Sequence, residues 1–195
     1  MRMRAAFALF ALASLAACES PPGPSSNEAG GAGNLNANAA GATANAAETK
    51  INEQALDRFG PIRVGATVAQ LADEGLAVAG RDQPAPGSTC SYARFKGLPG
   101  LAAMLDGEKV VRIDISSPQH EGPYGLRVGQ DEATALARLD GATVEPHPYT
   151  GPEGHYLSLH AAGAPFGLIA ETDGKTVQSW RIGQWEQVQW VETCF

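Results

Sequence analysis

The sequence has little charge and no apolar run long enough to cross a membrane as a helix. Charged residues make up 18% of the 195 residues, against about 25% in an average globular domain. Acidic residues outnumber basic ones by 21 to 14, and the net charge is −7. No basic surface is therefore available to neutralise phosphates, which argues against nucleic acid as a partner. No stretch reaches the ~18 apolar residues of a spanning helix.

The start of the chain is typical of a secretory signal. Arg2 and Arg4 precede an apolar stretch from residue 5 to residue 17, which has the length of a signal's hydrophobic region. Residues 15–18, Leu-Ala-Ala-Cys, resemble a bacterial lipobox, in which the cysteine thiol is diacylated and the signal is cut before it. An ordinary signal with an Ala-x-Ala cleavage site is the alternative. We expect residues 1–17 to be a lipoprotein signal and Cys18 to carry the lipid.

The segment after the lipobox is predicted to be a linker. Residues 18–50 are rich in Ala, Gly and Asn, and Leu35 is their only large apolar residue. Such a segment buries too little apolar surface to offset its ordering entropy, so we expect disorder. Glu19 is not the Asp that retains lipoproteins at the inner membrane in well-studied sorting systems. The predicted location is the cell envelope, with the chain anchored by lipid to the outer membrane and facing the periplasm.

The folded domain is predicted at residues 51–195, and it contains a pattern that occurs twice. Ile-Arg-Val-Gly at 62–65 recurs as Leu-Arg-Val-Gly at 126–129. Each copy precedes a helix start, because Thr67 opens a capping box and Asp131 takes a cap position. Chance similarity is the alternative at this low level of identity. The order of motifs predicts two copies of one unit, each beginning near a short helix.

Strands and turns follow each helix start. Asp-Gly dipeptides at 106–107 and 173–174 predict type I′ hairpin turns between apolar runs. The strands that leave them place Ile113 and Trp180 at corresponding positions, so we expect Trp180 to be buried. Residues 185–192 are predicted to form the last strand.

Together these signals predict an α+β fold. It consists of two tandem helix-plus-antiparallel-sheet repeats, at about 57–118 and 123–195. The two sheets are expected to be continuous, with the helices packed on one face.

This pattern also resembles a known group of proteins. The segments that carry it are residues 62–67, 125–129, 154–157, 171–174 and 190–194. They are similar to segments of uncharacterised bacterial lipoproteins, whose units resemble the repeats of β-lactamase-inhibitor-like proteins and of small outer-membrane assembly lipoproteins. The resemblance implies a fold, and it brings no catalytic residues with it.

Two cysteines remain once Cys18 is assigned to lipid. Cys90 and Cys194 lie in a domain predicted to be exported, where a cysteine pair is typical of a disulfide. Two free or metal-binding thiols are the alternative, but two cysteines without paired histidines make a poor zinc site. We therefore predict a disulfide between them.

The sequence offers no clear catalytic group. The four histidines have no metal-binding helical spacing and are expected in solvated loops or at sheet edges: His120, His147, His155 and His160. Asp114 and Glu171 could form a glycosidase carboxylate pair, but solvated acids beside turns are the simpler interpretation. No nucleophile elbow, phosphate loop or dinucleotide fingerprint occurs in the predicted domain. We predict no enzyme activity, metal or cofactor.

The residues predicted to contact a partner are aromatic. Tyr124, Tyr149 and Trp185 lie in or beside Gly- and Pro-rich connections, where exposure and recognition are common. The predicted function is a non-catalytic binding module, anchored to the membrane, for a protein or envelope polymer. The alternative is an inhibitor-like protein that caps a secreted or periplasmic enzyme. The sequence leaves the oligomeric state open.

The lipid anchor can be tested at one atom. Changing Cys18→Ser removes the thiol that would be acylated, so the protein should leave the membrane fraction or accumulate as an uncleaved precursor. Cell fractionation and the apparent mass on a gel measure both outcomes. A Cys18→Ser protein that is processed and fractionates with membranes as the unchanged protein does would show that the anchor is elsewhere.

Overall fold

The computed structural model describes residues 55–194. The predicted signal, Cys18 and the linker at 18–50 lie outside the described residues. None of the helices between residues 55 and 194 is long and apolar enough to cross a membrane.

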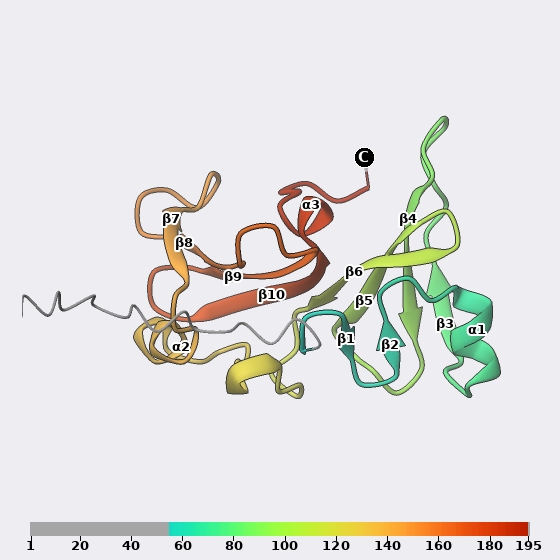
Figure 1. Cartoon of the computed structure of the whole chain (residues 1–195), viewed down its shortest axis with the longest axis horizontal. Coiled ribbons are helices and arrows are strands. Elements are labelled where there is room, and N and C mark those ends of the chain that lie inside the picture. The colour runs from blue at the N-terminus through green and yellow to red at the C-terminus, as the bar shows by residue number, and fades with distance from the viewer. Residues whose placement is uncertain (1–54, 195) are drawn as a thin grey trace, which may run out of the picture. The chain divides into compact units, whose positions relative to one another are not determined.

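Short strands dominate the described chain (Figure 1). In order, the elements are β1 (Arg58–Phe59), β2 (Ile62–Arg63), α1 (Val68–Asp73), β3 (Val78–Arg81), β4 (Cys90–Phe95), β5 (Leu101–Asp106), β6 (Lys109–Ile115), a 3₁₀ turn η2 (Pro123–Gly125), α2 (Glu132–Arg138), β7 (Thr143–Pro146), β8 (His155–Leu159), β9 (Phe166–Thr172), β10 (Val177–Gln184) and α3 (Trp185–Val188).

The strands from β3 to β10 form one antiparallel sheet. Its order is β3-β4-β5-β6-β10-β9-β8-β7, and β1 and β2 form a separate two-stranded sheet. At the centre, β6 pairs with β10 so that Ile113 lies opposite Ile182 and Ile115 lies opposite Trp180. The pairing of β6 with β10 therefore joins the strands before residue 116 to those after residue 142.

One face of the sheet carries the main hydrophobic core. Side chains alternate between faces along a strand, and Ile113, Ile115 and Ile182 point into this core with no exposed surface. Trp180 is 1% exposed, which confirms the prediction that it is buried. Val68 and Leu71 of α1 and Ala135 and Leu136 of α2 pack into the same cluster.

The opposite face, called the second face from here on, carries two smaller apolar clusters. One contains Tyr92, Met104 and Val111, and the other contains Tyr156, Ile169 and Val188. The helix α3 packs here against β10, β9 and β6, and Figure 1 shows it beside the chain's C-terminal end. The C-terminal segment, residues 185–194, thus covers part of the second face.

The predicted α+β class is wrong. The described residues form an eight-stranded and a two-stranded antiparallel sheet, and the three helices have only 6, 7 and 4 residues. The helices also do not share one face. Leu71 of α1 and Ala135 of α2 lie in the main core, whereas Val188 of α3 packs on the second face. The chain is a mainly antiparallel β protein, not two helix-packed repeats.

Helix length explains this error. The predicted starts are right, because Thr67 forms a capping box with Gln70 and the Asp131 side chain caps α2. However, α1 ends at Asp73, and Gly75 follows with a φ of +92°, a left-handed conformation that commonly ends helices. With so few turns, α1 and α2 add to the core without forming a layer of their own.

The prediction that residues 185–192 form a strand is also wrong. The Trp185 amide donates to the carbonyl of Pro165, and a helical turn follows at once, with the Gln189 amide donating to the Trp185 carbonyl. This turn folds the chain back over the second face, where Val188 becomes fully buried.

The first Asp-Gly turn lies where it was expected but differs in type. Asp106 pairs with Lys109 as part of the ladder, so the loop consists of Gly107 and Glu108. Only Gly107 has a positive φ, of +60°, whereas a type I′ turn needs a positive φ at both central residues. The predicted turn type is therefore wrong here, although the chain reverses at this dipeptide.

Glycine at position 122 is required by the packing of Trp180. A Cβ atom there would lie 2.6 Å from Trp180 Cζ2 and Cη2, and the backbone has an ordinary φ of −90°. Gly122→Ala should therefore destabilise the domain through overpacking alone, by about 1–3 kcal/mol. Urea unfolding of the mature chain measures the loss.

Gly80→Ala is the matched control. Nothing lies within 4 Å of a Cβ at that position, and its φ is not positive. The control should change stability by no more than about 0.5 kcal/mol. Equal effects of the two substitutions would contradict the packing argument.

Candidate functional site

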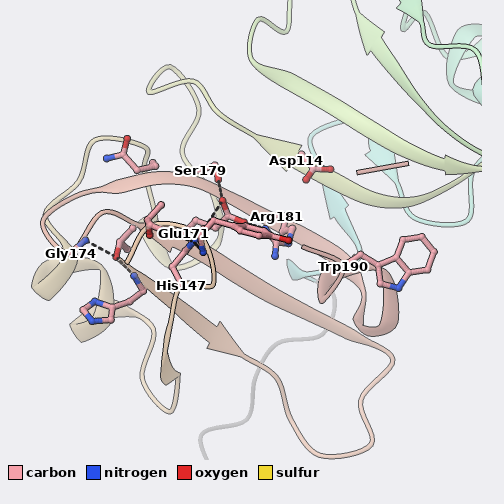
Figure 2. A network of polar contacts seen from close by, with 12 residues as sticks. Asp114, His147, Glu171, Gly174, Ser179, Arg181 and Trp190 are labelled. Carbon is pink, nitrogen blue, oxygen red and sulfur yellow. Dashed lines mark hydrogen bonds and ion pairs between the residues drawn. The ribbon is translucent and has the colours of Figure 1, made fainter. Parts of the chain in front are cut away.

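A row of polar side chains crosses the second face from one apolar cluster to the other. Its members, called the polar stripe, are Tyr92 on β4, Arg112 and Asp114 on β6, Ser179 and Arg181 on β10, Glu171 on β9 and Tyr156 on β8. They occupy the strand positions that alternate with core residues. Figure 2 shows Ser179, Glu171 and Arg181 side by side, with His147 next to Glu171.

Arg112 holds the C-terminal segment from one strand. It is 2% exposed, and its guanidinium contacts the Asp114 carboxylate at 2.9 and 3.1 Å. Nη2 also donates to the Tyr92 hydroxyl at 2.7 Å. Nη1 donates to the carbonyls of Gln187 and Trp190, both at 2.9 Å. Arg112 thus binds one carboxylate on the sheet and two carbonyls of the segment above it.

Arg181, on the neighbouring strand β10, likewise binds a carboxylate on the sheet and a carbonyl of the C-terminal segment. It is 4% exposed, its Nη1 donates to Glu171, and its Nε donates to the carbonyl of Val188 at 2.5 Å. The guanidinium carbon also lies 5.4 Å from the centre of the Tyr156 ring. Glu171 is further held by the Ser179 hydroxyl at 3.1 Å.

The electrostatics of the stripe favour a structural role. Burial raises the pKa of the Asp114 carboxyl, and the nearby Arg112 opposes that rise. Burial and the Asp114 charge also raise the pKa of Tyr92, so its hydroxyl stays protonated. Each arginine has a carboxylate partner, which offsets the cost of burying a charge. The chemistry of the stripe is therefore to hold the C-terminal segment on the sheet.

A covalent contact holds the far end of the segment. Cys90 and Cys194 are joined in the structure, with an S–S distance of 2.06 Å and a Cα–Cα distance of 5.1 Å. The Tyr149 hydroxyl donates to Glu192 at 3.0 Å, which brings the loop after β7 to the same segment.

Three hollows border the C-terminal segment. The first, of about 380 Å³, is lined by residues that include Tyr92, Asp114 and the Cys90–Cys194 pair. The second, of about 710 Å³, lies between the loop at 87–90, α3 and Trp190. The third, of about 420 Å³, is lined by side chains that include Tyr156, Trp185 and Val191. The segment therefore leaves recesses on the second face.

Large exposed apolar side chains gather on this segment and the loop beside it. Tyr149 is 67% exposed, Trp190 40% and Val191 38%. The remaining large exposed apolar residue of the described chain is Val144, on the edge strand β7. We call Tyr149, Trp190 and Val191 the apolar patch. Figure 2 shows the Trp190 ring pointing away from the stripe.

The structure separates the three aromatics predicted to form an interface. Tyr149 belongs to the patch. Tyr124 is partly buried against the main core, with a φ of +58°. Trp185 is also partly buried and stacks on His160, with ring centres 4.1 Å apart. The three side chains therefore do not form one surface.

Sequence reasoning missed the arginines and Trp190. A charged residue between two apolar positions of a strand, as in Val-Arg-Ile at 111–113 and Trp-Arg-Ile at 180–182, was an available signal for buried ion pairs. Asp114 and Glu171 are not simply solvated, because each is bound by an arginine. Within residues 55–194, no group of three or more His, Cys, Asp or Glu residues is placed to hold a metal ion.

Comparison with known proteins identifies no family for this chain. No family model matches the chain, and no curated protein matches it. Among solved structures, the chain is similar to the crystal structure of the uncharacterized protein yfeY from Escherichia coli, at 12% identity. The match covers 66% of this chain and 97% of that chain, with a TM-score of 0.46. A likeness of this degree carries no argument about function.

Removing Arg112 should destabilise the domain and free the C-terminal segment. Arg112→Ala leaves Asp114 without its partner and two carbonyls without a donor, a loss of about 3 kcal/mol or more. Arg127→Ala, which breaks an exposed pair with Glu121, should cost no more than about 1 kcal/mol. Urea unfolding measures the stability loss in each variant. Amide hydrogen exchange should become faster at residues 187–190 in Arg112→Ala but not in Arg127→Ala.

The loss of stability in Arg112→Ala should also depend on pH. Without Arg112 the pKa of Asp114 rises further, so the folded state keeps a proton that the unfolded state has released. Stability then falls as pH rises above about 4, the ordinary pKa of Asp. The difference from the unchanged protein should be smaller near pH 4 than at pH 7. The same loss at both values would contradict this account of Asp114.

Proposed function

We propose that the chain is a lipid-anchored, non-catalytic binding module of the cell envelope, and that it binds a protein partner through the apolar patch. The observation that carries this proposal is the placement of the exposed apolar side chains. Three of them belong to the C-terminal segment or contact it: Trp190 and Val191 are neighbours in that segment, and Tyr149 is bonded to Glu192. Exposed apolar side chains that are grouped, not scattered, are typical of interaction sites.

The composition of the patch supports a protein interface. Trp and Tyr are the residue types that most often dominate the binding energy when they fill a pocket of the partner. The hollows beside Trp190 and Val191 offer recesses for side chains of the partner in return. A surface with both projections and recesses provides the shape complementarity that specific interfaces need.

The rigidity of the patch also supports this function. Trp190 is fixed through its carbonyl by Arg112, and Glu192 and Cys194 are fixed by Tyr149 and Cys90. A surface held in its binding conformation loses little entropy when a partner docks. The predicted lipid on Cys18 and the linker would keep this surface close to the membrane.

Site-specific photo-crosslinking in the native cell tests the proposal. A photoreactive amino acid at Val191 should capture one defined partner, and the same amino acid at Ala133, exposed on α2, should not. With that partner purified, Trp190→Ala should weaken binding about tenfold or more, with the melting temperature nearly unchanged.

Val144→Ala is the matched control, since Val144 is 46% exposed but lies opposite Leu157 of the main core, on the other face of the sheet from the patch. It should leave the affinity unchanged. Equal capture from positions 191 and 133, or equal affinities of the two alanine variants, would overturn the proposed interface.

A further inference from the structure

Three carboxylates line the hollow beside Trp190. Asp106, Glu186 and Glu192 line this hollow of about 710 Å³, and none of the other described residues that line it is Lys, Arg or His. Asp106 accepts a hydrogen bond from Thr89, and Glu192 accepts one from Tyr149. Neither bond supplies a positive charge.

Most arginines of the described chain, in contrast, have a carboxylate partner. Seven arginines pair with an acidic side chain: Arg58, Arg63, Arg81, Arg94, Arg112, Arg127 and Arg181. Within residues 55–194, no ion pair involves Asp106, Glu186 or Glu192. The hollow therefore keeps a negative potential.

Two further features of the hollow favour a cationic, hydrogen-bond-donating occupant. The exposed Trp190 lies on its wall, and the face of an indole ring attracts ammonium and guanidinium groups. Gln187 also lines it, and its Oε1 atom is buried without a hydrogen-bond partner in the described chain. A buried acceptor that lacks a donor is costly, so a donor of the occupant that reached this atom would be favoured.

The other two hollows differ in charge. In the first, Asp82 pairs with Arg94 and Asp114 pairs with Arg112. The third contains one carboxylate, Glu145, together with His160. Of these three hollows, only the one beside Trp190 combines several carboxylates that are in no ion pair with an exposed aromatic ring.

We propose that the docking segment of the protein partner is basic, and that a Lys or Arg side chain of it enters this hollow and lies against Trp190. This inference rests on the proposed function, because it assumes that the partner covers the apolar patch. It adds the chemistry of the partner: a segment with at least one cationic side chain next to apolar ones. The acidic balance of the whole chain, 21 acidic against 14 basic residues, would speed the encounter.

Titration with two synthetic peptides tests the inference on the full mature chain in a neutral detergent. One peptide is acetyl-Gly-Lys-Gly-Lys-Gly-amide, and the other has Glu in place of both Lys residues. The readout is the NMR signal of the Trp190 indole N–H, assigned with Trp190→Phe. The lysine peptide should shift this signal with saturation, and the shift should weaken with added salt. The glutamate peptide should not shift it.

Matched charge changes separate a local site from the net charge. Glu186→Lys should reduce the affinity for the lysine peptide about tenfold or more. Asp73→Lys changes the net charge equally, but on α1, and should change the affinity no more than about twofold. If Glu186→Lys lowers the melting temperature, Glu192→Gln takes its place, since the amide oxygen can still accept from Tyr149.

Three results would overturn the inference. These are no shift with the lysine peptide, equal effects of Glu186→Lys and Asp73→Lys, or displacement of the lysine peptide by millimolar Mg²⁺ alone. If Trp190→Ala still abolishes capture of the partner while the lysine peptide gives no shift, the apolar patch stands and the basic segment does not. If Trp190→Ala also leaves partner capture intact, the proposed function fails as well.

Discussion

Two buried arginines fix the surface on which the rest of the molecule depends. Arg112 and Arg181 lie on β6 and β10, the strand pair that joins the two parts of the sheet. Burying a guanidinium is costly unless a carboxylate and further acceptors compensate. Here, some of those acceptors are carbonyls of the C-terminal segment. The segment therefore has one position on the second face, and the hollows and the apolar patch follow from that position.

Local signals in the sequence predicted local structure well. The caps at Thr67 and Asp131 start helices as expected, and the chain reverses at Asp106-Gly107. Even the two Val-Gly motifs make the same bond, because the amides of Gly65 and Gly129 each donate to a strand carbonyl at 2.7 Å. The fold class depended on how far the helices extend, and a cap says nothing about length. That is why the starts were right and the class was wrong.

The site was harder to predict because its contacts join distant parts of the chain. Arg112 binds carbonyls 75 and 78 positions away, and no pattern within a strand indicates such partners. Trp185 was predicted to be exposed because it lies beside a Gly-containing connection, and residues 185–192 were predicted to form a strand. Once those residues turn as a helix, Trp185 folds down onto His160 and Trp190 is carried outward. The helical turn thus exposes a different tryptophan from the one that the connection indicated.

The way in which the C-terminal segment is held explains how so small a patch could bind a partner. Ordering a residue costs about 1–2 kcal/mol in backbone entropy alone, so a loose tail would lose much of its contact energy on binding. In this chain the cost is met during folding. The arginines hold residues 187, 188 and 190, while Tyr149 and Cys90 hold 192 and 194. Val191 is exposed between these points with its neighbours already fixed. The contacts of Trp190 and Val191 with a partner can therefore contribute to affinity almost in full.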